Sequence, residues 1–194
     1  MGHESIRIIH DEHIALGKML HSLALMVERG PGDDQEVFFD VMRAMLFYID
    51  EFPTRLHHPK ESELLFPRVA RLAPQTQPLI ARLEKDHANG EAAVRELQHL
   101  LLAWELVGKT RQAAFTAAAR QYIEFSLEHM RLEETEILPA ALQVLSPADW
   151  KELEAAFSSN CAPFTGKYPH DPVYDRLMTY IVMRAPAPIG LGKH

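Results

Sequence analysis

Four long segments of the sequence place apolar residues at helical spacing, and short breaks separate one segment from the next. In each segment the apolar positions advance by three and four residues, which is the period of an α-helix with one buried face. The segments cover about residues 5–29, 33–73, 78–107 and 110–144. Four long helices joined by short connections predict an all-α fold, an antiparallel up-down-up-down four-helix bundle.

The predicted buried faces of the first three helices are mostly aliphatic, with a histidine on the first and on the third. On the first helix this face consists of Ile6, Ile9, His13, Leu16, Leu20, Leu23 and Val27. On the second it consists of Val41, Met45, Ile49 and Phe52, and on the third of Leu79, Leu83, His87, Val94, Leu97 and Leu101. Two imidazoles are therefore expected to point into the bundle.

Two prolines, Pro53 and Pro59, fall inside the second predicted helix. Each lacks the backbone N–H of a helical hydrogen bond, so each is expected to kink or interrupt the helix. The alternative is a pair of helices with a turn over residues 52–59. In both cases a local distortion lies beside His57.

Residues 1–145 contain the predicted bundle, and residues 146–194 form a shorter helical extension. Ser146-Pro147 and Asp171-Pro172 each combine an N-cap residue with a first-turn proline, so each predicts the start of a short helix. We expect the last ten residues to be mobile. The extension either caps the bundle or supplies the contact of a homodimer.

The composition excludes several classes of protein. With 20 basic and 27 acidic residues the formal net charge is −7, so a nucleic-acid-binding surface is not expected. No apolar run approaches membrane-spanning length and the N-terminus has no signal-peptide pattern, so we expect a cytoplasmic protein. A single cysteine, Cys161, excludes a disulfide framework and a cysteine-rich metal site. Eleven histidines leave imidazole and carboxylate as donors for a transition metal.

A short motif occurs twice along the chain. Residues 57–67 read HHPKESELLFP, and residues 129–139 read HMRLEETEILP. At a constant offset of 72 residues the two copies share a histidine, a glutamate and a proline: His57 and His129, Glu61 and Glu133, Pro67 and Pro139. The duplication therefore gives the second and fourth helices the same His-x-x-x-Glu pair.

The spacing within this pair has a chemical reason. Positions i and i+4 lie on one face of an α-helix, so each pair presents an imidazole and a carboxylate to one region. His13 and His87 add one imidazole from each of the other two helices. Four imidazoles and two carboxylates exceed what one four-coordinate zinc ion requires. They suit two metal ions bridged by the glutamates, with coordination positions left open for a small ligand.

These motifs resemble those of the hemerythrin-like, or HHE cation-binding, family over about residues 5–145. The resemblance implies a four-helix bundle with a non-haem di-iron centre, two iron ions joined by an oxo or hydroxo bridge; zinc or another divalent metal suits the same donors. Family members bind dioxygen, sense oxygen, iron or redox state, or respond to nitrosative stress. By position the implied metal ligands, with the two glutamates as bridges, are His13, His57, Glu61, His87, His129 and Glu133.

The sequence departs from the oxygen-carrying hemerythrins at two ligand positions. Those proteins carry His-x-x-x-His on the third helix, where this chain has His87 and Glu91, and an aspartate five residues after the last histidine. Here Glu133 follows His129 by four residues. The centre is then one imidazole short, unless Glu91 adds a carboxylate, which argues against simple oxygen carriage and leaves room for peroxide or oxidase chemistry.

Other polar residues near the motifs carry alternative interpretations. His58 points about 100° away from the preceding histidine on a helix, so we expect it outside the ligand set, next to the ligands or at the surface. Glu91, His10 and Tyr122 either approach the metal or are ordinary solvent-facing and core residues. Glu12 and Asp86 each precede a candidate ligand and either orient other groups or lie on a solvated face. Three further acidic residues are expected to face solvent or to pair with Arg68 and Arg131: Glu63, Glu134 and Glu136.

Three functions fit these motifs. The leading hypothesis is a cytoplasmic metal-binding protein whose di-iron centre binds dioxygen, nitric oxide or peroxide for sensing, storage or stress response. The second is a di-iron oxidase or peroxidase, and the third is a bundle in which a metal is purely structural. The expected partners are a small diatomic or peroxide ligand and a second copy of the chain, with neither nucleic acid nor membrane.

Overall fold

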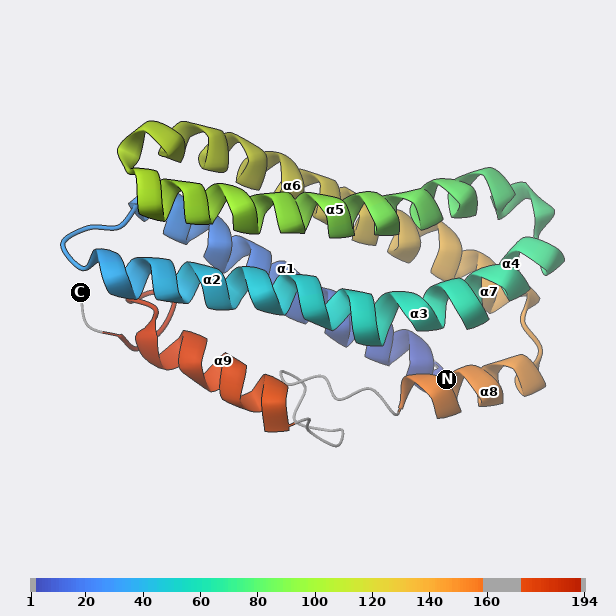
Figure 1. Ribbon diagram of the computed structural model, residues 1–194. Coiled ribbons are helices and arrows are strands. Elements are labelled where there is room, and N and C mark those ends of the chain that lie inside the picture. The colour runs from blue at the N-terminus through green and yellow to red at the C-terminus, as the bar shows by residue number, and fades with distance from the viewer. Residues whose placement is uncertain (1–2, 159–171, 193–194) are drawn as a thin grey trace.

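The computed structural model describes residues 3–158 and 172–192, and four long helical arms lie side by side in it (Figure 1). α1 (Glu4–Arg29) is the first arm, and α2 (Gln35–Phe52), α3 (His58–Lys60) and α4 (Phe66–Leu72) follow one another along the second. α5 (Gln77–Val107) is the third, and α6 (Gln112–Leu132) with α7 (Leu138–Val144) is the fourth. Because α1 contacts α2 and α6, and α5 contacts the same two helices, the predicted up-down-up-down bundle is confirmed.

The ends of these helices follow from residues that the sequence places there. The Asp34 side chain accepts a hydrogen bond of 3.1 Å from the backbone N–H of Val37 and caps α2. Gly30 and Gly108 end α1 and α5 with φ of 70° and 96°, a left-handed backbone that favours glycine. These residues fix where α2 begins and where α1 and α5 end, at the points where the chain reverses direction.

Three π turns widen the second and fourth arms. They cover Pro53–His57, Glu61–Leu65 and Glu133–Ile137, and α-helix continues on both sides of each. Two of the turns flank α3, which contains Pro59. The second arm is therefore one continuous, locally widened helix. The alternative of two helices joined by a turn over residues 52–59 is wrong, because the chain absorbs the missing proline N–H groups by widening.

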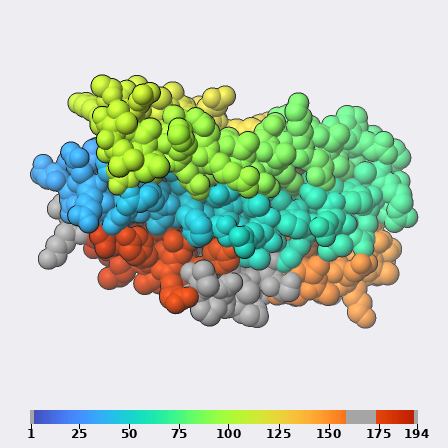
Figure 2. Space-filling model, in the orientation of Figure 1, coloured from blue at the N-terminus to red at the C-terminus, as the bar shows by residue number. Residues whose placement is uncertain are grey.

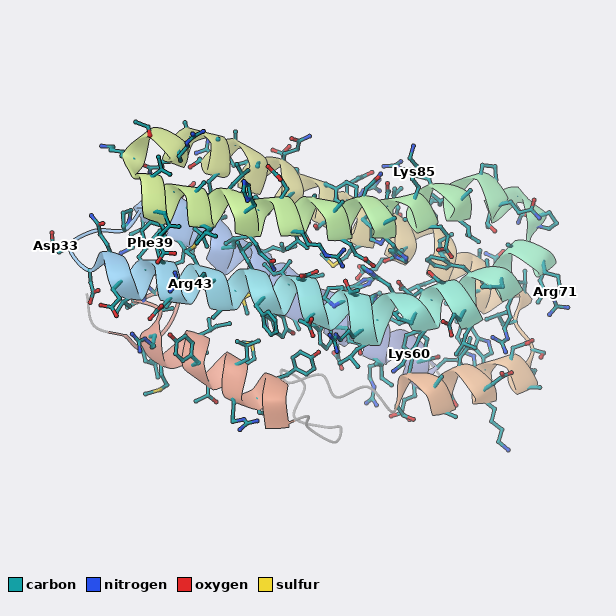
Figure 3. The ribbon with its side chains drawn as sticks, viewed as in Figure 1. Asp33, Phe39, Arg43, Lys60, Arg71 and Lys85 are labelled. Carbon is teal, nitrogen blue, oxygen red and sulfur yellow. The ribbon has the colours of Figure 1, made fainter. Side chains whose placement is uncertain are left out.

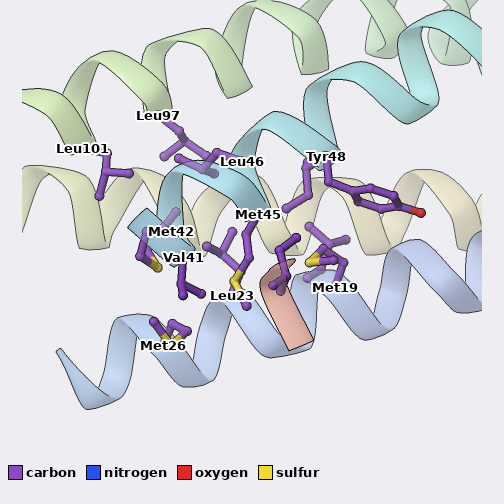
Figure 4. Close-up of a cluster of buried hydrophobic side chains, with 14 of the residues drawn as sticks. Met19, Leu23, Met26, Val41, Met42, Met45, Leu46, Tyr48, Leu97 and Leu101 are labelled. Atoms are coloured by element: carbon purple, nitrogen blue, oxygen red, sulfur yellow. The ribbon is translucent and has the colours of Figure 1, made fainter. Parts of the chain in front are cut away.

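The interior consists of two apolar clusters on either side of a polar layer. One cluster joins α1, α2, α5, α6 and α9, and its side chains from α1, α2 and α5 interdigitate in Figure 4. The other cluster joins the start of α1 with α4, α7 and α8. His13 lies between Ile9 of the second cluster and Met19 of the first, and His87 lies between Leu83 and Val94 in the same way. The polar layer therefore crosses the bundle at one level.

The extension is packed onto the bundle through two further helices. α8 (Pro147–Phe157) begins with a capping box between Ser146 and Asp149, and it buries Trp150 and Phe157 in the second apolar cluster. Arg68 of α4 pairs with acidic residues of α8, and the Lys60 ammonium lies over the Phe157 ring at 5.9 Å. α8 therefore closes one end of the bundle.

α9 (Pro172–Arg184) lies against α2, on the same side of the molecule as α8 (Figure 2). The residues that follow it fold back, because the Leu191 N–H donates to the Val182 carbonyl at 2.7 Å and the Gly192 N–H donates to Ala185. A Cβ atom at Gly192 would overlap the Arg184 carbonyl group. Residues 185–192 therefore lie back against the end of α9, and the mobility of the last ten residues stays a prediction. Cys161 and Asp171 lie outside the described residues.

Ile181 tests whether α9 belongs to the bundle core. Its side chain is 3% exposed and packs in the first apolar cluster. We expect Ile181→Ala to lower the free energy of unfolding by about 2–4 kcal/mol, because it leaves a cavity in that cluster. Chemical denaturation monitored by circular dichroism measures the change, with exposed Leu191→Ala as the control. A loss below about 0.5 kcal/mol would contradict a shared core.

Charged side chains such as Arg71 and Lys85 project from the outside of the bundle (Figure 3). Within residues 3–158 and 172–192, no helix combines the length and the apolar character needed to cross a membrane.

Candidate metal centre

Each of the four arms contributes one buried histidine to the polar layer. His13 comes from α1, His57 from the end of the first π turn, His87 from α5 and His129 from α6. All four are at most 8% exposed. Helical periodicity places them there, because each occupies an inward position in its arm.

Two glutamates complete this layer. Glu61 and Glu133 are the first residues of two π turns, and they are 0% and 1% exposed. Ionised carboxylates are rarely buried so completely unless cations or hydrogen-bond donors surround them. The six residues that the sequence predicts as metal ligands therefore all converge inside the bundle.

The donor atoms fall into two groups, each of which could hold a metal ion. In the first group one ligand atom from each of four residues lies within 4.8 Å of the others: His13, His57, Glu61 and Glu133. In the second group the same limit joins three imidazoles: His58, His87 and His129. The Nε2 atoms of His13 and His57 face each other at 3.1 Å.

Both glutamates lie between the two groups. Glu133 Oε2 is 3.3 Å from His13 Nε2, and Glu133 Oε1 is 3.1 Å from His129 Nε2. Glu61 Oε1 is 3.1 Å from His57 Nε2, and its Oε2 is 3.6 Å from His87 Nε2. Each carboxylate thus has one oxygen near an imidazole of the first group and the other near the second group. This is the arrangement that a bridging carboxylate requires.

Many of these atoms lack a hydrogen-bond partner among the described residues. They are all buried: both oxygens of Glu61 and of Glu133, Nε2 of His87, Nδ1 of His58, and both nitrogens of His129. Native proteins leave few buried polar atoms unsatisfied, so a cluster of this kind indicates groups that bind something else. Imidazole nitrogen and carboxylate oxygen suit iron, zinc and related ions, so the donor set fits a transition metal.

Carboxylates outside the layer orient the imidazoles of the first group. His13 Nδ1 donates to Glu134 Oε1 at 2.9 Å, and His57 Nδ1 donates to Glu12 Oε2 at 2.7 Å. A carboxylate only accepts, so these bonds place the proton on Nδ1 and direct the lone pair of Nε2 toward the centre. Glu12 is itself 1% exposed, which makes this a buried, charge-assisted hydrogen bond.

The second group has weaker support. Ser62 Oγ donates to Glu84 at 2.9 Å and lies 3.2 Å from His87 Nδ1, which therefore donates to the serine oxygen. Asp86 lies 3.8 Å from His129 Nδ1, beyond hydrogen-bond range. The His58 and His87 rings stack with their centroids 3.9 Å apart. Ring packing and the Ser62 hydroxyl therefore orient the imidazoles of the second group, whereas carboxylates orient those of the first.

The histidines and glutamates also shift one another's protonation. Burial lowers the pKa of the His13 imidazole, but the adjacent carboxylates of Glu133 and Glu134 outweigh it and raise that pKa to about 9. Burial raises the pKa of Glu133, but the charge of His129 and the other imidazoles around the carboxylate hold that pKa well below its usual range. Without metal, protons on the imidazoles balance the carboxylates, and a bound cation would replace them.

The remaining imidazoles divide by their surroundings. Burial lowers the pKa of the His57 imidazole, but the charge of Glu61 outweighs it and raises that pKa well above its usual range. The charge of Glu133 outweighs burial in the same way and raises the pKa of His129. Burial and the neighbouring imidazoles hold the pKa of His58 well below the usual range. His58 is therefore neutral at pH 7, the form that binds metal.

A cavity of about 40 Å³ opens on the layer. Its walls include the histidines of both groups, apolar side chains such as Leu16 and Val94, and the hydroxyl residues Tyr122 and Ser126. Burial raises the pKa of Tyr122 to about 12, so its phenol keeps its proton. A space of this volume admits molecules of a few atoms and excludes organic substrates of ordinary size.

Comparison with known families gives a match over residues 4–141 to Hemerythrin, the hemerythrin HHE cation binding domain. The chain belongs to this family. Its matched region ends in α7, so α8 and α9 follow the hemerythrin HHE domain. An uncharacterised protein of Haemophilus influenzae is 28% identical over 137 residues, which cover 68% of this chain and 75% of that protein.

The main difference from the sequence prediction within this hemerythrin HHE domain concerns His58. The expectation that it points away assumes an ideal α-helix, but His57 ends a π turn with φ −97° and ψ −67°. A wider turn advances through a smaller angle per residue, so both histidines face the centre. The doublet HH in HHPKES was the only sequence signal for this additional imidazole.

Four acidic predictions also need correction or refinement. Glu134 binds His13, so its assignment to solvent or to an arginine pair is wrong. Glu12 binds His57, so of its two alternatives the orienting role is the one the structure shows. Their signal was a position one residue before or after a candidate ligand. Asp86 is nearly buried beside His129, and Glu91 lies outside both metal-binding groups, 3.5 Å from Arg95.

The alternatives for His10 and for the acidic residues near Arg68 and Arg131 are also resolved. His10 is half exposed and lies 3.2 Å from Glu134, so it adds to the support of the first group without reaching the centre. Arg131 pairs with Glu128, and Arg68 pairs with Asp149 and Glu152 of α8. Glu63 and Glu136 are exposed, so of the two alternatives for these glutamates the solvent-facing one is confirmed.

Proposed function

We propose that this protein binds two iron ions per chain and uses them to bind a small ligand, namely dioxygen, nitric oxide or peroxide, for sensing, storage or stress response. The observation that carries the proposal is the position of Glu61 and Glu133, each with one oxygen toward each group of imidazoles. A single ion would use only one of these groups.

The proposed ligand set divides into two halves. The first ion takes nitrogen from His13 and His57, the second takes nitrogen from His87, His129 and His58, and the two glutamates supply oxygen to both. This set adds His58 to the six ligands expected from the sequence. The fifth imidazole then comes from α3 and replaces the one missing from the third helix.

Charge balance supports two divalent ions. Five carboxylates lie at or beside the centre: Glu12, Glu61, Asp86, Glu133 and Glu134. Low-dielectric surroundings penalise uncompensated negative charge, so this excess of carboxylates favours two divalent cations over one. A single structural ion would leave most of this negative charge to be balanced by protons.

Iron with an open coordination position supplies redox-active ligand binding, and the residues around it define what can enter. The cavity of about 40 Å³ admits diatomic molecules and peroxide. Its apolar walls favour uncharged ligands, and the Tyr122 phenol and the Ser126 hydroxyl line the same cavity. The cavity thereby selects ligands by their size and polarity.

Metal analysis of protein purified anaerobically without chelators tests the proposal. We expect close to two iron ions per chain and a ligand-to-iron absorption band that changes on addition of azide or nitric oxide. One ion per chain without ligand-dependent absorption would overturn the proposal in favour of a structural metal. Rapid peroxide turnover, in place of a stable ligand-bound spectrum, would move the function to the oxidase or peroxidase class.

His58 provides a separate prediction about the second ion. We expect His58→Ala to weaken binding of one of the two ions by more than roughly tenfold, because it removes a nitrogen donor from that half of the centre. Equilibrium dialysis against iron(II) measures both affinities, with exposed His99→Ala as the control. Two ions bound with unchanged affinity would exclude His58 from the ligand set.

A further inference from the structure

The three π turns share one relation to the sequence. Each begins six residues before a proline: Pro53 before Pro59, Glu61 before Pro67, and Glu133 before Pro139. Two of the three begin at the proposed bridging glutamates. The third ends at His57, another proposed ligand. The backbone is therefore widened where side chains face the metal centre.

We propose that Pro67 and Pro139 are positioning residues for the two bridging glutamates. Each proline stabilises a π turn that begins at the glutamate and thereby fixes where its carboxylate lies. The inference rests on the proposed two-ion centre, since positioning matters only if both carboxylates bridge.

The backbone hydrogen bonds carry this proposal. The N–H of Phe66 donates to the carbonyl of Glu61, and the N–H of Leu138 donates to the carbonyl of Glu133. Both bonds span five residues, where an α-helix would span four. The duplicated motif therefore repeats its backbone distortion as well as its side chains.

A proline makes this distortion less unfavourable. In an α-helix the residue at position 67 would donate to the carbonyl of residue 63, but proline has no N–H and its ring clashes with that carbonyl. The α-helical arrangement has therefore already lost one hydrogen bond, and the widened turn competes with a weakened alternative. The same holds at position 139 and the carbonyl of residue 135.

Proline alone does not produce the widening. Pro53 follows α2, which has no π turn before it. The π turns form where a proline follows residues that face the centre, which indicates that the buried glutamate and the proline act together. An α-helical register would carry the glutamate to a different angle around the arm.

The exposure of Pro67 distinguishes the proposed positioning role from a role in side-chain packing. Its ring is exposed at the surface, and Pro139 is half-buried. Replacing Pro67 by alanine therefore removes few side-chain contacts and returns a backbone N–H to the helix. Any effect on the metal centre has to pass through the backbone to Glu61.

Pro67→Ala and Pro139→Ala test the proposal in the full-length protein. We expect each variant to raise the melting temperature of the metal-free protein, because the α-helical hydrogen bond is restored. We also expect each to weaken iron(II) binding by roughly tenfold or more, because the carboxylate is no longer held in place. Pro78→Ala is the matched control: Pro78 is exposed in the first turn of α5, with no π turn before it.

A positioning role predicts opposite changes in the two measurements: a higher melting temperature of the metal-free protein and a lower affinity for iron(II). Iron affinity in both variants within twofold of wild type would overturn the proposal, as would a parallel fall of metal-free stability and affinity. A crystal structure of Pro67→Ala that retains the π turn at Glu61 would also overturn it. Wild-type protein that binds no iron would overturn the proposed function, whereas two ions bound equally by wild type and variants would overturn only this inference.

Discussion

Glu133→Ala is expected to reduce the bound iron from two ions per chain to one or none. Glu133 has one oxygen 3.3 Å from His13 Nε2 and the other 3.1 Å from His129 Nε2, so its loss removes a donor from both ions. Loss of a supporting residue outside the ligand set typically costs 10- to 100-fold in metal affinity. Loss of a shared ligand is therefore expected to cost more than about 100-fold for at least one ion.

The control for this variant lies in the same π turn. Glu136 is exposed, so Glu136→Ala removes an equal charge and an equal side chain without touching the centre. Iron content by mass spectrometry and the azide-dependent absorption band measure both variants. Glu133→Ala that retains two ions with an unchanged spectrum would exclude Glu133 as a bridge.

Sequence reasoning identifies the bundle and its inward histidines because both depend on helical period alone. Val41, Met45 and Ile49 are buried as predicted, and so are Leu83 and Leu97. These faces follow from steps of three and four residues, which hold wherever the helix is regular. The regular parts of the arms could therefore be predicted from the sequence.

The buried face of α1 is wider than the predicted stripe. Ser5, Ile8 and Glu12 are buried, while Ile6 and Leu16 are only half-buried. The face is centred about one residue earlier than expected, because polar Ser5 and Glu12 belong to it and apolar character did not reveal them. A sequence pattern assigns a glutamate to the surface even where, like Glu12, it is buried and hydrogen-bonded to an imidazole.

His58 eludes prediction for a different reason. Its direction depends on a π turn, and the sequence signals for widening are prolines that equally predict a kink or a break. The docking of α8 and α9 depends on side-chain packing between segments far apart in the chain. Non-local contacts of this kind leave no periodic signal.

The stability of the metal-free protein is expected to fall as pH rises from 6.5 to 9. The pKa of His13 in the folded protein is about 9, above the ordinary histidine value of 6.5, because the Glu133 and Glu134 carboxylates outweigh burial. A raised pKa means that protonation stabilises the fold, fully below pH 6.5, and that this contribution is lost as pH rises through 9. The shift is worth on the order of 3 kcal/mol, or about 6–12 °C in melting temperature.

The metal-loaded protein is expected to lack this alkaline loss. A bound ion occupies the lone pairs of the inward nitrogens, so no proton remains there to be released. Melting temperatures measured with and without excess chelator between pH 6.5 and 9 should therefore diverge as pH rises. The variant Glu134→Gln provides a second test. It weakens the hydrogen bond from His13 that helps to raise the pKa of His13, so the melting temperature of the metal-free variant should depend less steeply on pH. Parallel curves for the loaded and metal-free wild type would contradict the placement of His13 among the ligands, because a ligand cannot hold a proton and a metal ion at the same nitrogen.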